Sequence, residues 1–168
     1  MKNSKAGFSL IELLIVVVVI GIIAAIAVPG LLASRRSANE GSTVSSLRIL
    51  HEAQMTYVSS FGKGEYAGDI GAGTITTFNV FTSLKLVDDV LGSGSKSGYN
   101  YVGGREPSSS GSAAQFFISA IPVSMDPMLG TGSRRFGIST DGVMRTDLTL
   151  GAHYANTADA AAAPAMGN

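Results

Sequence analysis

Hydrophobic residues form three successive patterns along the chain. A continuous apolar run extends from Leu13 to Val28, behind a short basic stretch and a single carboxylate, Glu12. Apolar residues then recur at helical spacing between positions 31 and 61, with charged residues between them. After Gly98 the chain has short runs of aromatic and β-branched residues separated by Gly, Ser and Asp. These patterns predict a long N-terminal helix followed by a small domain that contains β-strands.

We expect the first two patterns to form one helix over residues 8–61. Residues 8–30 are apolar on all sides, as lipid or a bundle of helices requires, and residues 31–61 are amphipathic. The apolar stripe of this second part consists of Val44, Leu47, Leu50, Tyr57, Val58 and Phe61. Pro29 and Gly30 are expected to kink the helix, because proline removes a backbone donor and glycine lowers helix propensity.

Residues 62–150 are predicted to form a globular head. Four strands are expected, at residues 98–103, 114–122, 136–140 and 143–147, with a two-residue hairpin turn at Asp141-Gly142. A short helix capped by Asn79 is expected over residues 79–85, although a strand over 74–81 is an alternative. The expected fold class is α+β, in which the apolar face of a small antiparallel sheet packs on the helix stripe. Residues 104–112 are expected to form a loop, and the Ala-rich residues 151–168 a flexible tail.

The segment Gly7-Phe8-Ser9-Leu10-Ile11-Glu12 resembles the processing site of type IV pilins and of the pseudopilins of type II secretion. The resemblance implies that a prepilin peptidase removes residues 1–7 by cutting between Gly7 and Phe8, and that the new amine of Phe8 is methylated. It also implies the pilin fold, with Glu12 as the retained acid and Pro29 as a helix-bending proline. The resemblance covers about the first 30 residues. The cysteines and the second proline found in several family members are absent.

Glu12 is a functional hypothesis on physical grounds as well. A carboxylate within a membrane segment costs about 2.5 kcal/mol or more, so its presence needs a reason. In a filament, Glu12 would pair with the amine of Phe8 on a neighbouring subunit and set the axial register between the two. The alternative is a carboxylate that reaches the membrane surface and has no partner.

The resemblance implies a structural subunit that waits in the inner membrane and then polymerises into a type IV pilus on the cell surface. Its implied partners are other copies of the chain, a prepilin peptidase, an assembly ATPase acting through a platform protein, and an outer-membrane secretin. Two alternatives remain open. A type II secretion pseudopilin shares the same N-terminal motif, although the absence of Trp favours a pilus subunit. A secreted soluble binding protein would arise if a conventional signal peptidase cut after Ala27, in the small-residue sequence Ala25-Ile26-Ala27.

Charge and composition argue against several other classes. The formal net charge is zero, and loss of Lys2 and Lys5 with residues 1–7 would lower it to −2, so a specific nucleic-acid binder is not expected. The chain has no Cys, and its two histidines, His51 and His153, do not have metal-ligand spacing. We therefore predict no catalytic residue, no cofactor and no enzyme activity.

Three further groups of residues have a possible but less favoured chemistry. Calcium binding would require Asp126, Asp141 and Asp147 to converge, but their spacing matches no calcium loop and solvated turns are expected instead. Residues 92–98 superficially resemble a phosphate loop but lack its Gly-Lys-Ser/Thr ending, so a flexible linker is expected. The basic pairs at 35–36 and 134–135 could contact acidic lipid, DNA or a neighbouring subunit, but a solvated surface or salt bridges between filament subunits are expected instead.

Overall fold

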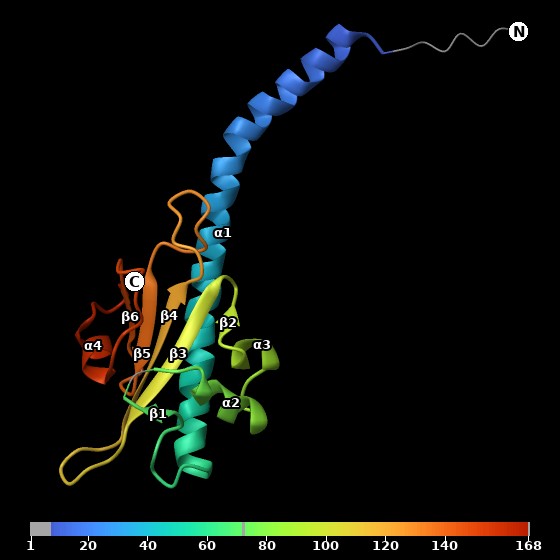
Figure 1. Cartoon of the computed structure of the whole chain (residues 1–168). Coiled ribbons are helices and arrows are strands. Elements are labelled where there is room, and N and C mark those ends of the chain that lie inside the picture. Colours follow the sequence, from blue (N-terminus) through green and yellow to red (C-terminus); the bar gives the residue numbers. More distant parts are fainter. Residues whose placement is uncertain (1–7, 72, 168) are drawn as a thin grey trace, which may run out of the picture. The chain divides into compact units, whose positions relative to one another are not determined.

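The structure, a computed structural model, describes residues 8–71 and 73–167 (Figure 1). The chain divides into two compact units at Ser34, and we call the unit that begins at Arg35 the head unit. The elements in chain order are α1 (Leu10–Ser60), β1 (Asp69–Ile70), α2 (Thr76–Ser83), α3 (Asp89–Gly92), β2 (Ser95–Lys96), β3 (Tyr99–Glu106), β4 (Gln115–Pro122), β5 (Arg135–Ser139), β6 (Met144–Asp147) and α4 (Thr157–Ala162). The expected α+β class, with a long N-terminal helix and a small sheet, is confirmed.

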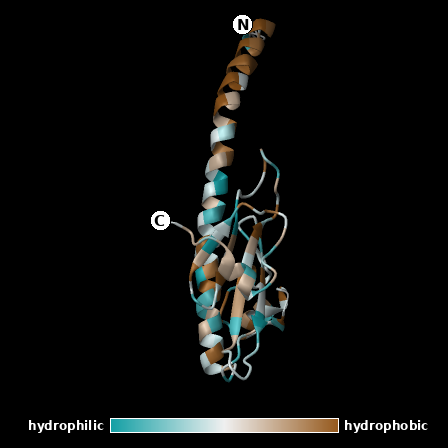
Figure 2. Ribbon diagram, turned by 90° about the vertical axis from the view of Figure 1, so that its left-hand side faces the viewer, coloured by the Kyte–Doolittle hydropathy of each residue, from teal (hydrophilic) through white to brown (hydrophobic). Residues whose placement is uncertain are grey.

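The N-terminal unit is the apolar part of α1. Hydrophobic residues make up most of this part of the helix (Figure 2), and their side chains are exposed. The helix remains continuous through Pro29, although Pro29 has no N–H to donate to the carbonyl of Ala25. One turn further on, the hydroxyl of Ser34 donates to the carbonyl of Gly30 at 3.0 Å. The expected kink at Pro29 and Gly30 stays a prediction.

The head unit is built on a mixed sheet with the strand order β1-β3-β4-β5-β6, and β2 also pairs with β3. The central strands β3 to β6 are antiparallel, as expected, and their register places Ile118 between Gly103 and Ile138. The sheet differs from the expected antiparallel one only at its edge, where the short strand β1 runs parallel to β3. The chain can make this parallel pair because residues 71–98, which contain α2, α3 and β2, connect the two strands.

The head-unit part of α1 covers one face of the sheet (Figure 1). Leu47 and Leu50 are fully buried against inward-facing side chains of the sheet and of α2. The fully buried aromatic residues of this core are Phe78, Phe81, Tyr99, Tyr101, Phe116 and Phe136. Gln54 lies in the same stripe and is also fully buried, because its side-chain amide donates to the carbonyl of Ala67 and accepts from the N–H of Ala67, both at 2.9 Å. A polar residue therefore takes a core position in which all of its polar atoms have partners.

The opposite face of the sheet is covered by the C-terminal segment, so the flexible tail expected at residues 151–168 is not found over the described residues 151–167. Phe117 points to this face and packs with Tyr154 of the segment and Ala160 of α4, all nearly or fully buried. Asn156 caps α4 by accepting from the N–H of Asp159 at 2.7 Å. Beyond α4, a bridge between Ala165 and Arg145 extends the sheet past β6. These contacts could not be predicted from the sequence, because the Ala-rich segment has no hydrophobic periodicity and packs on the sheet through a few residues distant in the chain.

Two local expectations also need correction. The short helix α2 begins at Thr76, so Asn79 lies inside it, and its N-terminal flank Ile75 makes no side-chain capping bond. The β5–β6 connection spans residues 140–143, and only Gly142 has a positive φ, of 72°. Asp141 instead stabilises this turn through its carboxylate, which accepts from the N–H of Val143 at 3.0 Å.

Candidate functional site

The predicted processing site lies at the start of the described chain. Gly7 lies outside the described residues. Phe8 precedes α1, and its side chain is 87% exposed. The carbonyl of Ser9 accepts from the N–H of Leu13 at 3.2 Å, which makes Ser9 the residue that leads into the helix. The side chain of Phe8 is therefore accessible to solvent, while the backbone immediately after it is already ordered by the helix.

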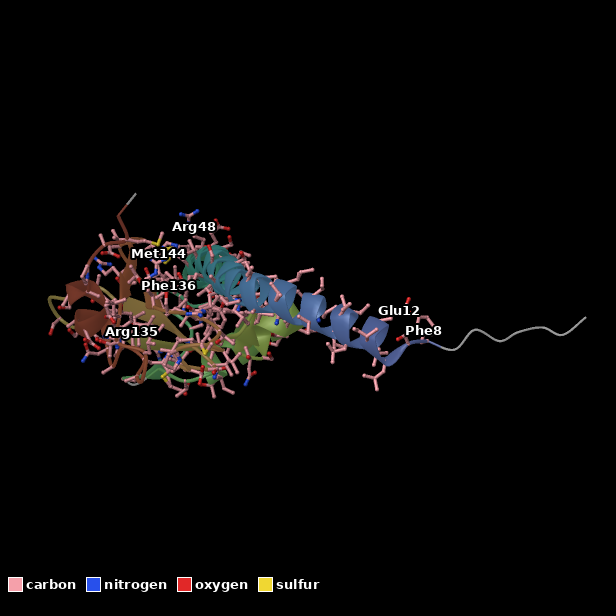
Figure 3. All side chains as sticks on the ribbon, turned by 90° about the horizontal axis from the view of Figure 1, so that it is seen from above. Phe8, Glu12, Arg48, Arg135, Phe136 and Met144 are labelled. Atoms are coloured by element: carbon pink, nitrogen blue, oxygen red, sulfur yellow. The ribbon has the colours of Figure 1, made fainter. Side chains whose placement is uncertain are left out.

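Glu12 lies in the first turn of α1 and is exposed. Phe8 and Glu12 lie at the same end of the helix (Figure 3). Among residues 8–71 and 73–167, no side chain forms an ion pair with Glu12. A carboxylate in the first helical turn interacts favourably with the helix dipole, by about 0.3–1 kcal/mol at an exposed site. This local stabilisation is much smaller than the cost of a charge in a membrane, so it does not explain Glu12 by itself.

The apolar surface that follows Glu12 has no partner within the described chain. One 18-residue window of α1 is apolar and long enough to cross a membrane, and none of it is buried. Side chains around the helix are about half exposed or more, as shown by Leu13 at 64%, Val17 at 56% and Ile23 at 60%. Such a surface requires a hydrophobic environment, either lipid or other apolar helices.

The two basic pairs behave differently from one another. Arg134 and Arg135 are both engaged within the head unit: Arg134 with Glu40, and Arg135 with Asp147 and the ring of Tyr154. Arg36 donates to the carbonyl of Met128 at 3.1 Å, and Arg35 is exposed. Only the pair at 35–36 therefore presents a cation that has no salt-bridge partner among the described residues.

The three aspartates considered for calcium are not brought together. Asp141 pairs with Arg145, whose hydrogen bond lowers the pKa of Asp141 to about 2. Asp147 pairs with Arg135 at 2.8 Å. Asp126 accepts from two backbone N–H groups of its own turn. Within the described part of the chain, no three His, Asp or Glu side chains cluster in a way that could hold a metal ion.

His153 and the Gly/Ser segment have structural positions that the sequence did not indicate. His153 is partly buried, and its Nδ1 lies 3.1 Å from the hydroxyl of Ser119. Burial lowers the pKa of His153 to about 4. The segment 92–98, expected to be a linker, contains the edge strand β2, and Lys96 in it pairs with Asp88 at 3.3 Å.

Sequence patterns also missed a buried carboxylate and an exposed apolar loop. Glu40 in α1 is only 8% exposed and binds Ser133 and Arg134 of the β4–β5 connection. In the same connection, Met128 and Leu129 are 69% and 68% exposed. Neither feature has a sequence signal, because a helical glutamate next to small residues and two apolar residues beside a proline are both common in solvated segments.

Comparison with known proteins supports the reading of the N-terminus. Residues 2–28 match the family described as prokaryotic N-terminal methylation motif. The chain is 38% identical over 66 residues to the type IV major pilin protein PilA of Myxococcus xanthus, and 58% identical over 40 residues to the type IV wide pilus major component PilA4 of Thermus thermophilus. It is also 34% identical over 56 residues to the type II secretion system core protein G of Aeromonas hydrophila.

These similarities cover part of each protein. The matched segments make up 39%, 24% and 33% of this chain, and 30%, 30% and 39% of the respective relatives. No solved structure matches the chain significantly. The chain thus carries a prokaryotic N-terminal methylation motif, followed by an α+β head unit, and is similar to two type IV pilins and a type II secretion core protein.

Proposed function

We propose that this chain is a structural subunit of a type IV pilus, made as a precursor in the inner membrane and cut between Gly7 and Phe8. The observation that carries the proposal is the methylation motif at residues 2–28, which includes the first part of a helix whose apolar surface is unburied. A motif for processing and a surface that needs other helices belong together in a subunit that polymerises.

The proposed mechanism is assembly rather than catalysis. The apolar surface of α1 would leave lipid and pack against the same surface of other copies. Small residues allow close approach of such helices, and this part of α1 contains Gly21, Ala24, Ala25 and Ala27. Glu12 would then meet the methylated amine of Phe8 on a neighbouring copy. Removing either charge would leave the other unpaired in an apolar environment, which makes the pair selective for one axial register.

The proposed partners follow from this pathway. A prepilin peptidase would remove residues 1–7 and methylate Phe8 while α1 is still in the inner membrane. An assembly ATPase would act through a platform protein to extract the subunit, and a secretin would let the filament cross the outer membrane. The final location would be the cell surface.

A type II secretion pseudopilus subunit is the second candidate, and the similarity to core protein G favours it. The two candidates predict different locations for the assembled chain. A pilus subunit is recovered from filaments sheared from intact cells, whereas a pseudopilus subunit remains in the cell envelope. Shearing followed by immunoblotting of both fractions separates them.

A soluble protein released after Ala27 is compatible with the head unit, because the residues of α1 that are buried in the head begin at Glu40. The deciding experiment is N-terminal sequencing and mass measurement of the chain isolated from sheared filaments or from the envelope. Methylated Phe8 supports the proposal, and Val28 as the first residue overturns it. A host with inactive prepilin peptidase is the control, in which residues 1–7 should be retained.

A further inference from the structure

The connection between β4 and β5 contains an apolar loop that the fold does not bury. We call residues 123–130 the apolar loop. Its four large hydrophobic side chains are about half exposed or more: Val123 at 51%, Met125 at 48%, Met128 at 69% and Leu129 at 68%. The loop lies beside the head-unit part of α1 (Figure 1).

Hydrogen bonds hold the apolar loop in one conformation. The carboxylate of Asp126 accepts from the N–H groups of Met128 and Leu129, at 2.8 and 2.6 Å. The N–H of Gly130 donates to the carbonyl of Asp126 at 2.8 Å, and a Cβ at position 130 would lie 2.4 Å from that oxygen. The turn therefore requires glycine at 130 and fixes the backbone that presents Met128 and Leu129 to solvent. A fixed, exposed apolar tip is unusual unless another surface covers it.

The apolar loop is tied to the start of the head unit. Arg36 donates to the carbonyl of Met128 at 3.1 Å, and Asn39 donates to the carbonyl of Thr131 at 2.9 Å. Arg36 follows Leu32, the last residue of the apolar segment, by four residues. Four residues span at most about 14 Å even when fully extended. The loop is therefore held near the point at which the chain leaves the apolar segment.

The length of the apolar segment, residues 13–32, matches the thickness of the hydrocarbon core of a bilayer. From Leu13 to Leu32 the helix has 20 residues, which corresponds to about 30 Å, the thickness of the hydrocarbon core. The headgroup region adds about 5–8 Å on each side. When residues 13–32 span the membrane, Arg36 and the apolar loop bound to it lie within reach of the headgroups.

The charges beside the apolar loop fit an anionic surface. Arg35 is exposed, and Arg36 lies against the loop backbone. Asp126 is the acidic residue of the loop; its Oδ1 accepts from the turn, and its negative charge lies near the positive charge of Arg36, which lowers the pKa of Asp126 further. Apolar side chains next to exposed cations are typical of segments that lie in a membrane interface.

We propose that the apolar loop docks on the surface of a bilayer that contains anionic lipids, with Met128 and Leu129 in the headgroup region and Arg35 beside the lipid phosphates. The inference rests on the membrane insertion of residues 13–32 in the proposed function, and not on filament assembly. Docking gives the head a second attachment to the membrane besides α1. It also has to be released when the subunit is extracted.

The test places a fluorescent label on the apolar loop of the full chain. The chain has no Cys, so Leu129→Cys provides a single labelling site. Ile70→Cys is the matched control, because Ile70 is 66% exposed and pairs with Arg105, at the end of β3 opposite to the loop. Both labelled proteins are reconstituted at low protein-to-lipid ratio in phosphatidylcholine vesicles, with or without phosphatidylglycerol. Quenching by headgroup-labelled lipids is then measured.

We expect the label at 129 to be quenched strongly and the label at 70 weakly. On vesicles that contain phosphatidylglycerol, Arg35→Gln should lower the ratio of docked to undocked loop about fivefold, because each basic residue near an anionic surface contributes about that factor. On phosphatidylcholine alone, the same substitution should have little effect. If the chain floats with the vesicles but the labels at positions 129 and 70 are quenched equally, docking of the loop is overturned and the membrane anchor is unaffected. A chain that does not float with vesicles overturns both. If the label at position 129 is not quenched by lipid but becomes more shielded from solvent as the protein-to-lipid ratio rises, the loop contacts a second copy of the chain. This result also overturns the proposal.

Discussion

Arg134, at the end of the β4–β5 connection, forms an ion pair with the buried carboxylate of Glu40 in α1. Its Nε and Nη2 donate to one oxygen of Glu40 at 3.1 and 2.7 Å, and Ser133 donates to the other oxygen through its N–H and its hydroxyl at 2.8 and 2.7 Å. Burial by itself would raise the pKa of Glu40, but these hydrogen bonds, first those of Ser133 and then that of Arg134, outweigh it and hold the pKa below its ordinary value. The pair attaches the β4–β5 connection to α1.

Glu40→Gln should therefore destabilise the head unit. The neutral amide cannot accept at both positions, which leaves donors of Ser133 and Arg134 without partners, and we expect a loss of about 1–3 kcal/mol in the free energy of unfolding. Because the pKa of Glu40 is lowered by folding, its contribution is present above the pKa of the unfolded chain and is lost as the pH falls. Chemical unfolding at neutral pH measures the loss. Glu52→Gln, at an exposed position of the same helix, is the control and should change little, and equal stability of the two variants would contradict the role of the pair.

Tyr154 should contribute most of the stability with which the C-terminal segment packs on the sheet. It is 1% exposed, packs with Phe117, and lies under the guanidinium of Arg135 at 4.0 Å. Its hydroxyl donates to Asp147 at 3.1 Å. Tyr154→Ala should cost about 3–5 kcal/mol and make residues 148–167 sensitive to limited proteolysis, whereas Tyr154→Phe loses only the hydrogen bond, about 1 kcal/mol. Unchanged protease resistance in Tyr154→Ala would show that other contacts hold the segment.

His153 should make the head unit less stable in mild acid. Its pKa of about 4 in the folded chain is below the ordinary value of 6.5, chiefly because of burial. The unfolded chain therefore binds the proton first, so stability is complete above pH 6.5 and is lost between about pH 6.5 and 4, by at most about 3 kcal/mol. Thermal unfolding at pH 7 and pH 5 measures this loss. Because glutamine does not titrate, His153→Gln should remove the part of the stability loss between pH 7 and pH 5 that is due to His153. If the variant loses as much stability as the unsubstituted protein, other groups cause the loss.

Glu12→Gln should allow processing but impair filament assembly. The amide is compatible with the membrane, so cleavage before Phe8 should continue. It cannot neutralise the amine of a neighbouring subunit, and an unpaired charge in an apolar interface costs several kcal/mol, so the filament yield should fall by more than about tenfold. The yield is measured by shearing and immunoblotting, and Phe8 is checked by N-terminal sequencing. Glu52→Gln is again the matched control, and normal filaments from Glu12→Gln would remove the proposed register role.

The periodic parts of the chain were predictable. The long helix, the central strands and the stripe that includes Leu47 and Leu50 follow from apolar spacing, since a helix or strand of regular pattern buries one face. The candidate site at Phe8 and Glu12 was inferred from a short contiguous motif, and its role stays a prediction. The parallel strand β1 and the short helix α3 were not predicted, because each is too short for a periodic signal.

The sequence by itself determined the methylation motif at residues 2–28 and the apolar helix that overlaps it, since each is formed by residues adjacent in the chain. Only the tertiary structure decided what isolated residues do. Gln54 interrupts the apolar stripe in the sequence and is nevertheless a core residue, because Ala67 supplies both of its partners. The segment 151–167 has the composition of a flexible tail and nevertheless packs on the sheet, because Tyr154 contacts Phe117 of β4. Such contacts join residues far apart in the chain, and no local pattern contains both members.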